Sequence, residues 1–414
     1  LLSQDPPPKQ LQFIFSLYTQ GQLEQALYNA TELLAQFPHS IALYNIAGAS
    51  NVGLMKYDAA IESFKQILRI KPDFADAYNN MGIALNNKGD PDAAIDSYRM
   101  AVLINARYSE AYSNMGIAQR NKGNLDAAID SCKKALKINP DFAEAYNNMG
   151  NAQKDKGDLD AAIDSCKQAL TINPEYADAL RGMGNALTTN GDLDAALGSY
   201  REALRISPDS AQLYNDIGNV LQEKGEQNKA IDSYKRAIEI RPDYAEVFNN
   251  MGTALRALGY LDDAMASYKQ AFKIKPDYAE AYNNIGNCFK ESGDIAGAIE
   301  NYKQALLVNS NFDEAYNNLG LALKDKGELD AAIDCFKQAL RVNPSYAKAY
   351  SNLGIALKDL GQFHEAIESY DRAITIDPSN FEAHSNRANV LKEIGELEAA
   401  ADSFKKAINI NPDF

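Results

Sequence analysis

The residues from 313 to 346, DEAYNNLGLALKDKGELDAAIDCFKQALRVNPSY, decide the fold of this chain of 414 residues. Apolar side chains recur at helical spacing in the first half of the stretch, at Tyr316, Leu319 and Leu323. The second half has the same spacing, for example at Ile333 and Phe336. Each half therefore predicts an amphipathic helix with one buried face.

A glycine and a proline mark the ends of these helices. Gly327 lies between the two halves, where a helix that ends in the left-handed conformation favours a residue without Cβ. Pro344 follows the second half and has no N–H with which to continue a helix. Acidic residues three positions apart, such as Asp277 and Glu280, predict a capping box at the start of a first helix. The stretch therefore predicts two helices joined by a tight turn.

The same pattern recurs every 34 residues, without insertion or deletion, from residue 7 to residue 414. These 408 residues make twelve copies, because 12 × 34 = 408. One helix pair cannot bury its own apolar stripe, so the stacking of neighbouring pairs has to complete the core. We therefore expect an all-α fold, a right-handed α-solenoid (superhelix) of about twelve helix-turn-helix units.

The two ends of the array differ from its middle. Residues 1–6 are expected to form an N-terminal extension, and residues 7–40 a degenerate capping unit in which Gln10, Phe13 and Ile14 replace the usual residues. Residues 41–414 are expected to form eleven further units of one continuous superhelix. The last copy stops where another first helix would begin, so we expect the array to continue, or to be capped, beyond residue 414 in a longer polypeptide.

A family resemblance rests on these same residues. The pattern Tyr-x-x-Leu-Gly-x-x-Leu begins at Tyr316, and Ala332, Phe336, Ala339 and Pro344 follow at fixed offsets. The chain resembles tetratricopeptide-repeat proteins throughout these copies. Two departures are notable: Tyr or Phe replaces the usual first-position Trp in nearly all full copies, and cysteines at 132 and 166 replace an aromatic residue.

Composition and charge exclude several functional classes. The net charge of -15 and the pI of about 4.8 oppose binding to nucleic acid or to an anionic membrane. No run approaches the roughly 18 apolar residues of a membrane helix, and residues 1–9 lack a secretory signal. We expect a soluble, cytoplasmic protein.

The residues that usually perform chemistry are scarce. The four cysteines lie far apart without a C-x-x-C motif, and the three histidines, His39, His364 and His384, fall in different copies. No glycine-rich phosphate loop is present. We expect no metal, no cofactor and no catalytic activity in the chain itself.

A row of asparagines is the strongest candidate for a binding site. In stacked helix pairs the first helices line the inner surface, and one position of these helices is repeatedly Asn. The row consists of Asn80, Asn114, Asn148, Asn250, Asn284, Asn318, Asn352 and Asn386, with Gly182 and Asp216 interrupting it. Asn is a poor interior helix former, so its recurrence at an exposed position needs a reason. Its amide can pair with the main chain of an extended peptide, which predicts a protein or peptide partner.

The same row has a parallel in one group of enzymes. It looks like the asparagine ladder in the repeat superhelix of O-linked N-acetylglucosamine transferases, where groove asparagines hold the backbone of protein substrates. The resemblance implies a peptide-binding role for the asparagines of this chain. The alternative is that duplication copied the asparagines passively, as the near-identical residues 125–133 and 159–167 suggest.

Two charged rows accompany the asparagines. The basic row consists of Arg120, Lys154, Arg256, Lys290, Lys324, Lys358 and Lys392. The acidic row consists of Asp155, Glu223, Glu291, Asp325, Asp359 and Glu393. Four cations are expected to support a bound peptide: Lys154, Lys290, Lys324 and Lys358. Solvated helix faces often contain such pairs, so the rows do not specify the charge of the partner.

Three functions are consistent with the sequence. The leading hypothesis is a non-catalytic scaffold that holds an extended peptide in its concave groove. The second is the substrate-recognition arm of a larger glycosyltransferase- or sulfotransferase-type enzyme. The third is a structural module that assembles into homo-oligomers through an open end or its convex face.

Overall fold

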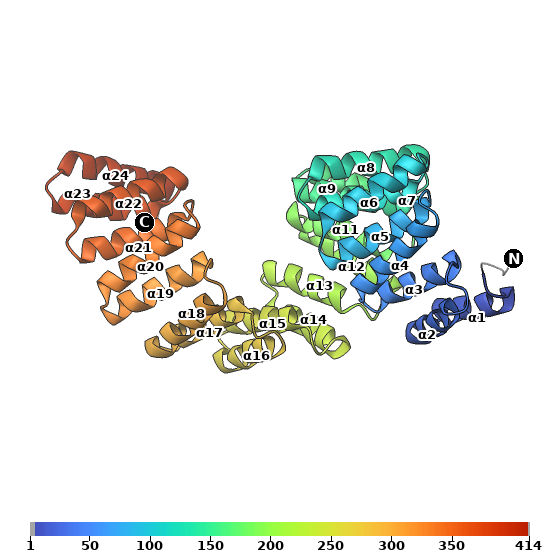
Figure 1. Ribbon diagram of the computed structural model, residues 1–414. Coiled ribbons are helices and arrows are strands. Elements are labelled where there is room, and N and C mark those ends of the chain that lie inside the picture. Colours follow the sequence, from blue (N-terminus) through green and yellow to red (C-terminus); the bar gives the residue numbers. More distant parts are fainter. Residues whose placement is uncertain (1–4, 413–414) are drawn as a thin grey trace. The chain divides into compact units, whose positions relative to one another are not determined.

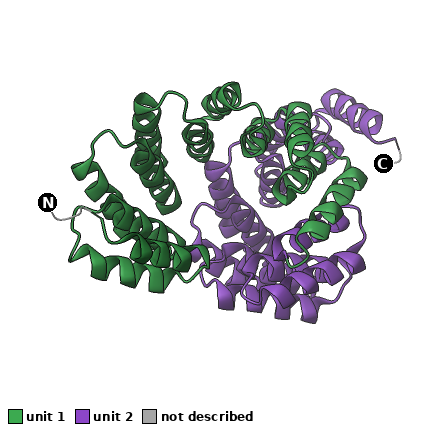
Figure 2. Cartoon of the chain, turned by 90° about the vertical axis from the view of Figure 1, so that its right-hand side faces the viewer, with its two compact units in different colours: residues 1–209 green, residues 210–414 purple. Residues whose placement is uncertain are grey.

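The structure, a computed structural model, describes residues 5–412 and contains 24 α-helices over that range (Figure 1). Residues 1–4 of the predicted extension and residues 413–414 of the last copy lie outside the described residues. The chain divides into two compact units, residues 1–209 and 210–414, which are coloured separately in Figure 2. Each unit is described by itself.

Each unit contains twelve helices in six consecutive pairs. Unit 1 comprises α1 (Pro8–Thr19), α2 (Leu23–Leu34), α3 (Ile41–Gly53), α4 (Tyr57–Ile70), α5 (Ala75–Lys88), α6 (Pro91–Ile104), α7 (Ser109–Asn121), α8 (Leu125–Ile138), α9 (Ala143–Lys156), α10 (Leu159–Ile172), α11 (Ala177–Thr189) and α12 (Leu193–Ile206). Unit 2 comprises α13 (Ala211–Glu223), α14 (Gln227–Ile240), α15 (Ala245–Ala257), α16 (Leu261–Ile274), α17 (Ala279–Glu291), α18 (Ile295–Val308), α19 (Asp313–Lys326), α20 (Leu329–Val342), α21 (Ala347–Asp359), α22 (Phe363–Ile376), α23 (Phe381–Glu393) and α24 (Leu397–Ile410). The helix content and the twelve pairs confirm the predicted fold class.

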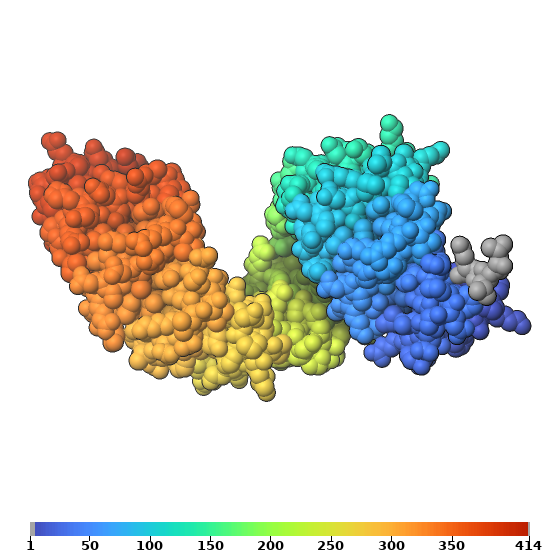
Figure 3. Space-filling model, in the orientation of Figure 1, coloured from blue at the N-terminus to red at the C-terminus, as the bar shows by residue number. Residues whose placement is uncertain are grey.

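Helix pairs stack in chain order within each unit, as the continuous run of colours shows (Figure 3). The first helix of a pair contacts the first helix of the next, for example α5 with α7 and α15 with α17. Over the described residues, no second helix contacts another second helix. First helices contact one another along the stack and second helices do not, so the first helices lie on the inner side of each unit.

The glycines between paired helices have the predicted conformation. Gly89 and Gly327, for example, have φ values of 91° and 89°, in the region that favours glycine. One repeat lacks this glycine. Its position is occupied by Met55, the single non-glycine residue with positive φ among the described residues, at 58°.

The predicted capping boxes are wrong. Helix α17 begins at Ala279, with the aromatic Tyr278 as its N-cap residue and no side-chain cap, so Asp277 lies outside the helix. In three other repeats the corner is organised one step earlier, by an asparagine beside the proline. Asn343 Oδ1, for example, accepts a hydrogen bond from the Ser345 N–H at 3.1 Å. This Asx turn, rather than a capping carboxylate, sets the direction in which the next helix begins.

A ring of the second helix packs against a glycine of the first in most repeats. A Cβ added to Gly286 would lie 2.6 Å from the Tyr302 ring, and one added to Gly320 would lie 2.7 Å from the Phe336 ring. Both rings are fully buried. The glycine is therefore needed for the close approach of ring and helix.

Cysteines replace this ring in two repeats, as predicted. Cys132 and Cys166 are buried, and burial raises the pKa of the Cys166 thiol to about 11. The thiols therefore stay protonated near neutral pH and act as small apolar residues. In the same two repeats a glutamine accepts a hydrogen bond from a serine across the helix pair, Ser131 to Gln119 and Ser165 to Gln153.

Candidate functional site

The predicted asparagine row, which we call the ladder, lies on the inner side of both units. Unit 1 contains Asn80, Asn114 and Asn148, and unit 2 contains the other five. The prediction that this position is exposed is wrong, because all eight side chains are half-buried. The reason is contact with the first helix of the preceding repeat.

Seven ladder asparagines tie consecutive first helices together. In each case Nδ2 donates to a side-chain oxygen one repeat earlier, over 2.8 to 3.1 Å. The donor and acceptor pairs are Asn80 and Asn45, Asn114 and Asn79, Asn148 and Ser113, Asn250 and Asn215, Asn284 and Asn249, Asn318 and Asn283, and Asn352 and Asn317. The ladder therefore has a structural role that the sequence pattern did not reveal.

The bond is missing at Gly182 and at Asn386 of the described ladder. Gly182 has no side chain to donate, and the Oδ1 atom of Asn147, buried one repeat earlier, has no partner. Asn386 makes no such bond within residues 5–412, and the buried Ser351 hydroxyl one repeat earlier also lacks a partner. These gaps show which inter-repeat contacts the ladder normally provides.

The structural role leaves part of each ladder amide available. An asparagine amide has two N–H donors and an acceptor oxygen. In Asn114, Asn148, Asn284 and Asn352 the inter-repeat bond uses one donor, and within the described residues no group donates to Oδ1. Each of these amides is thus held in one orientation with an acceptor and a donor left for a ligand.

The charged rows pair with one another across repeats. Arg120 donates to Asp155 of the next repeat at 2.5 Å, and Arg256 lies 3.3 Å from Glu291. Burial raises the pKa of Asp155, but hydrogen bonds from Arg120 and Lys154 outweigh it and hold that pKa below its usual range. These half-exposed pairs contribute about 1 kcal/mol at most to stability.

Three of the four predicted supporting lysines make ion pairs with carboxylates of the chain. Lys154 lies 3.1 Å from Asp155, and both Lys290 and Lys324 lie near Asp325, at 3.6 and 4.0 Å. Lys358 makes no ion pair within the described part of the chain. The lysines are therefore partly committed to the protein's own carboxylates, which the spacing of the rows did not predict.

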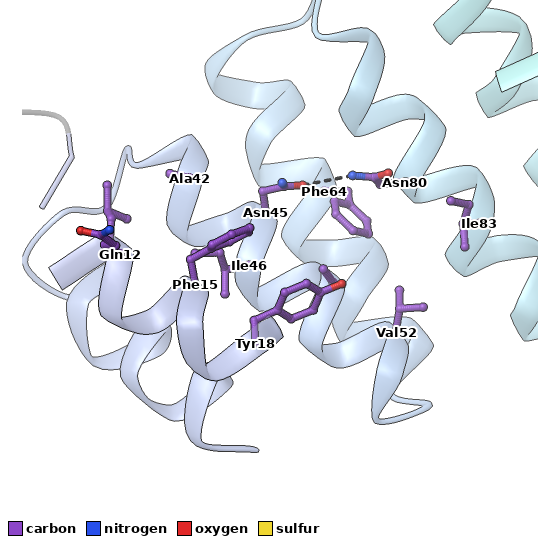
Figure 4. A pocket seen from close by; sticks show the side chains of 12 residues that line it. Gln12, Phe15, Tyr18, Ala42, Asn45, Ile46, Val52, Phe64, Asn80 and Ile83 are labelled. Carbon is purple, nitrogen blue, oxygen red and sulfur yellow. Dashed lines mark hydrogen bonds between the residues drawn. The ribbon is translucent and has the colours of Figure 1, made fainter. Parts of the chain in front are cut away.

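An apolar pocket of about 630 Å³ opens on the inner side of the first three repeats (Figure 4). Phe15 and Tyr18 of α1, Ile46 and Val52 of α3 and Ile83 of α5 form much of its wall. No ionisable Asp, Glu, Lys, Arg or His side chain lines it. The pocket can take an apolar side chain, which sequence analysis missed by interpreting the first repeat only as a cap.

The ninth residue of each repeat forms the floor of the inner face and differs between repeats. It is Ile83 in the third repeat but Asn287 in the ninth. In four repeats of the described chain it is polar and binds the tyrosine hydroxyl of the second helix. Tyr302 donates to Asn287 at 2.7 Å, and Tyr234 donates to Asn219 at 2.8 Å. These contacts fix the polar floor residues beside the ladder.

Between residues 5 and 412, no three His, Cys, Asp or Glu side chains gather in a way that could hold a metal ion. No helix in that range is both long and apolar enough to cross a membrane.

Comparison with solved structures gives several matches of known fold. A crystal structure of MamA is 31% identical, with coverage of 39% of this chain and 95% of that chain and a TM-score of 0.37. A second MamA structure is 30% identical, covering 41% and 92%, also with a TM-score of 0.37. The APC/C hetero-tetramer Cut9-Hcn1 is 13% identical, covers 97% and 93%, and has a TM-score of 0.50, which shows a shared fold. No curated protein matches the chain.

Two family models match the repeats directly. The model described as TPR repeat matches residues 56–89, 184–225, 218–259, 252–293, 286–327 and 320–361. The model described as Tetratricopeptide repeat matches residues 75–108, 109–142, 143–176, 347–380 and 381–414. Together they cover residues 56–176 and 184–414. Stacked repeats of this kind are scaffolds whose inner surfaces bind other proteins. The chain belongs to the tetratricopeptide-repeat family.

Proposed function

We propose that this protein is a non-catalytic scaffold that holds an extended segment of a partner protein along its inner face, with the ladder amides bound to the partner's main chain. The resemblance to the asparagine ladder of O-linked N-acetylglucosamine transferases implies the same role. The observation that supports the proposal is the hydrogen bonding of the ladder amides. Asn114, Asn148, Asn284 and Asn352 are each fixed by one inter-repeat hydrogen bond and retain an acceptor and a donor.

Fixed amides suit main-chain recognition for an energetic reason. Ordering a free side chain at an interface costs about 0.5 to 1.5 kcal/mol, and this cost falls when the side chain is already held in place. An extended main chain offers N–H and C=O groups in regular alternation, whatever its side chains. A row of fixed amides can bind such a chain independently of its sequence, while residues beside the row select its side chains.

A matched pair of variants separates this function from the structural role of the ladder. Replacing Asn284, Asn318 and Asn352 by Ala removes three ladder amides and their three bonds to the asparagines 35 residues earlier, together with a longer bond from Asn318 to Asn287 at 3.4 Å. Replacing their acceptors Asn249, Asn283 and Asn317 by Ala removes the same three bonds but keeps the ladder amides. Only the first triple variant should lose peptide binding.

The assay begins with peptides selected from a random library on the immobilised full chain. Their affinities for both triple variants are then measured by calorimetry, with thermal unfolding as a check on folding. The ladder variant should bind at least about tenfold more weakly, since three hydrogen bonds contribute about 0.5 to 1.5 kcal/mol each. Methylating alternate peptide nitrogens should also weaken binding to the parent chain. Equal affinity of the two variants, or indifference to methylation, would show that the ladder does not hold a main chain.

A further inference from the structure

A polar pocket of about 480 Å³ lies on the inner side of unit 2, at its first two repeats. Helix α13 contributes Asn219, Gln222 and Glu223, the start of α14 contributes Gln227, and α15 contributes Glu246, Asn250 and Thr253. The ladder residue Asn250 forms part of the wall, with Nδ2 bound to Asn215 and Asn219 at 3.1 Å each. We call this the acid-amide pocket. It adjoins the row to which the partner's main chain is assigned.

The pocket has negative charge without a nearby compensating cation. Glu223 and Glu246 are its only charged residues, and neither makes an ion pair within residues 5–412. Other acids of the same row are neutralised, as Glu291 is by Arg256 and Asp325 by Lys290. Both carboxylates are exposed and reachable from solvent.

The sequence explains why Glu223 differs. The cation that neutralises an acid of this row stands 35 residues earlier, as Arg120 does for Asp155 and Arg256 for Glu291. Thirty-five residues before Glu223 the sequence has Thr188, which has no charge. Its chain neighbour Gln222 is also neutral, whereas Asp325 is preceded by Lys324. Glu223 thus lacks both of the cations that its equivalents have.

Gln227 adds an acceptor to the wall that is unpartnered within the described residues. The Oε1 atom of Gln227 is buried and has no partner, while its Nε2 donates to the Gln222 carbonyl at 3.4 Å. The Asn219 and Gln222 side-chain oxygens accept from the Tyr234 hydroxyl. A ligand that matches this wall must therefore bring positive charge and several donors.

We propose that the acid-amide pocket binds an arginine side chain of the partner segment, with the guanidinium between Glu223 and Glu246. This inference rests on the proposed function, because Asn250 would hold the main chain from which that arginine projects. A guanidinium supplies five N–H donors in a planar fork and stays charged at all relevant pH values. Its hydrogen bonds to carboxylates are stronger than those between neutral groups. The pocket thus selects a basic residue at one position of an otherwise sequence-independent groove.

The test uses the full chain and two pools of short dye-labelled peptides. In one pool the central residue is arginine and in the other it is citrulline, which has nearly the same shape but no charge; the other positions are mixtures of Ala, Ser, Thr and Leu. Fluorescence anisotropy should show about tenfold tighter binding of the arginine pool at low ionic strength. The preference should shrink as salt is raised to about 0.15 M and beyond, because the carboxylates are exposed.

Two charge-matched variants locate the effect. Glu223→Gln combined with Glu246→Gln should abolish the preference for arginine, because both pools then meet a pocket without charge. Asp262→Asn combined with Asp263→Asn changes the net charge equally on α16, away from the pocket, and should preserve the preference. Asn250→Ala should weaken binding of both pools alike.

The outcomes separate the inference from the function on which it rests. Equal binding of both pools to the parent chain, with loss of both on Asn250→Ala, would overturn the arginine site and leave the ladder function standing. A preference that survives the double Gln variant would also overturn the site. Failure of both pools to bind would overturn the site and the proposed function together.

Discussion

The inner face of the first three repeats and that of repeats seven to nine are built from equivalent helices, but the residues that form their floors differ. In the first region the ninth residue of the repeat is apolar at Ala49 and Ile83, beside the pocket that Phe15 lines. In the second it is Asn219, Thr253 and Asn287. The ladder has members in both regions, Asn80 in the first and Asn250 and Asn284 in the second. One residue per repeat therefore sets the polarity of the groove without changing the fold.

The buried ring on the second helix also differs between repeats with a polar and an apolar floor residue. Asn287 Oδ1 accepts a hydrogen bond from the Tyr302 hydroxyl at 2.7 Å. In the next repeat the corresponding residues are Leu321 and Phe336. Tyr302 and Phe336 are both fully buried. A buried hydroxyl needs a partner and a buried benzene ring does not, so the two positions are coupled. In these two repeats the floor residue and the ring differ together.

The largest expected effect comes from breaking this coupling in the polar region. Asn287→Leu leaves the buried Tyr302 hydroxyl without its acceptor and should lower the free energy of unfolding by about 2 kcal/mol. Adding Tyr302→Phe reproduces the Leu321 and Phe336 combination of the next repeat and should recover most of the loss. Urea unfolding of the full chain measures the change, and hydrogen exchange in α17 and α18 localises it.

The double variant is the decisive member of this set. Coupled residues give a double-variant effect much smaller than the sum of the two single effects. If Asn287→Leu with Tyr302→Phe is as unstable as Asn287→Leu alone, the hydroxyl is not the reason for the polar floor.

A smaller effect is expected from the apolar region, on ligand binding rather than on stability. The neutral dye N-phenyl-1-naphthylamine should bind in the pocket of Figure 4 with enhanced fluorescence. Phe15→Ala should weaken that binding about tenfold, since the lost contact with about 55 Å² of apolar surface corresponds to roughly 1.4 kcal/mol.

A neighbouring phenylalanine provides the control. Phe13 is 55% exposed and Phe15 is 56% exposed, but only Phe15 lines the pocket. Phe13→Ala should leave the dye affinity unchanged. Equal losses in both variants would mean that the dye binds to exposed aromatic surface and not to this pocket.

The fold could be predicted because its determinants are local and repeated. Glycines such as Gly327 and prolines such as Pro344 bound each helix, and the apolar spacing of residues 313–346 determines the buried faces. Helix starts were predicted less well, since acidic pairs such as Asp277 and Glu280 match a capping box. In the structure Tyr278 is the N-cap residue instead, and no side chain caps the helix.

The site was predicted only in part because its contacts join residues from different repeats. The position of the ladder follows from helical periodicity, but the acceptor of Asn284 is Asn249, one whole repeat away, and no spacing rule within a helix reveals that bond. The same holds for the ion pair of Arg120 with Asp155. The apolar pocket combines side chains from α1, α3 and α5, whose approach depends on how the pairs stack. Sequence patterns therefore identified the row but not its partners.

The smallest expected effect has the opposite sign and comes from a repeat in which floor and ring do not match. Tyr370 is fully buried, its hydroxyl has no hydrogen-bond partner among residues 5–412, and the ninth residue of its repeat is Ile355. Burial accordingly raises the pKa of Tyr370. Tyr370→Phe removes a desolvated, unpaired hydroxyl and should raise the free energy of unfolding by up to about 1 kcal/mol. The same substitution at Tyr302 breaks a hydrogen bond and should lower it by about 1 kcal/mol. Thermal midpoints of the two variants should therefore move in opposite directions. If both fall, the Tyr370 hydroxyl contributes to stability through a contact other than a hydrogen bond, and the pairing of floor residue and ring would not extend to this repeat.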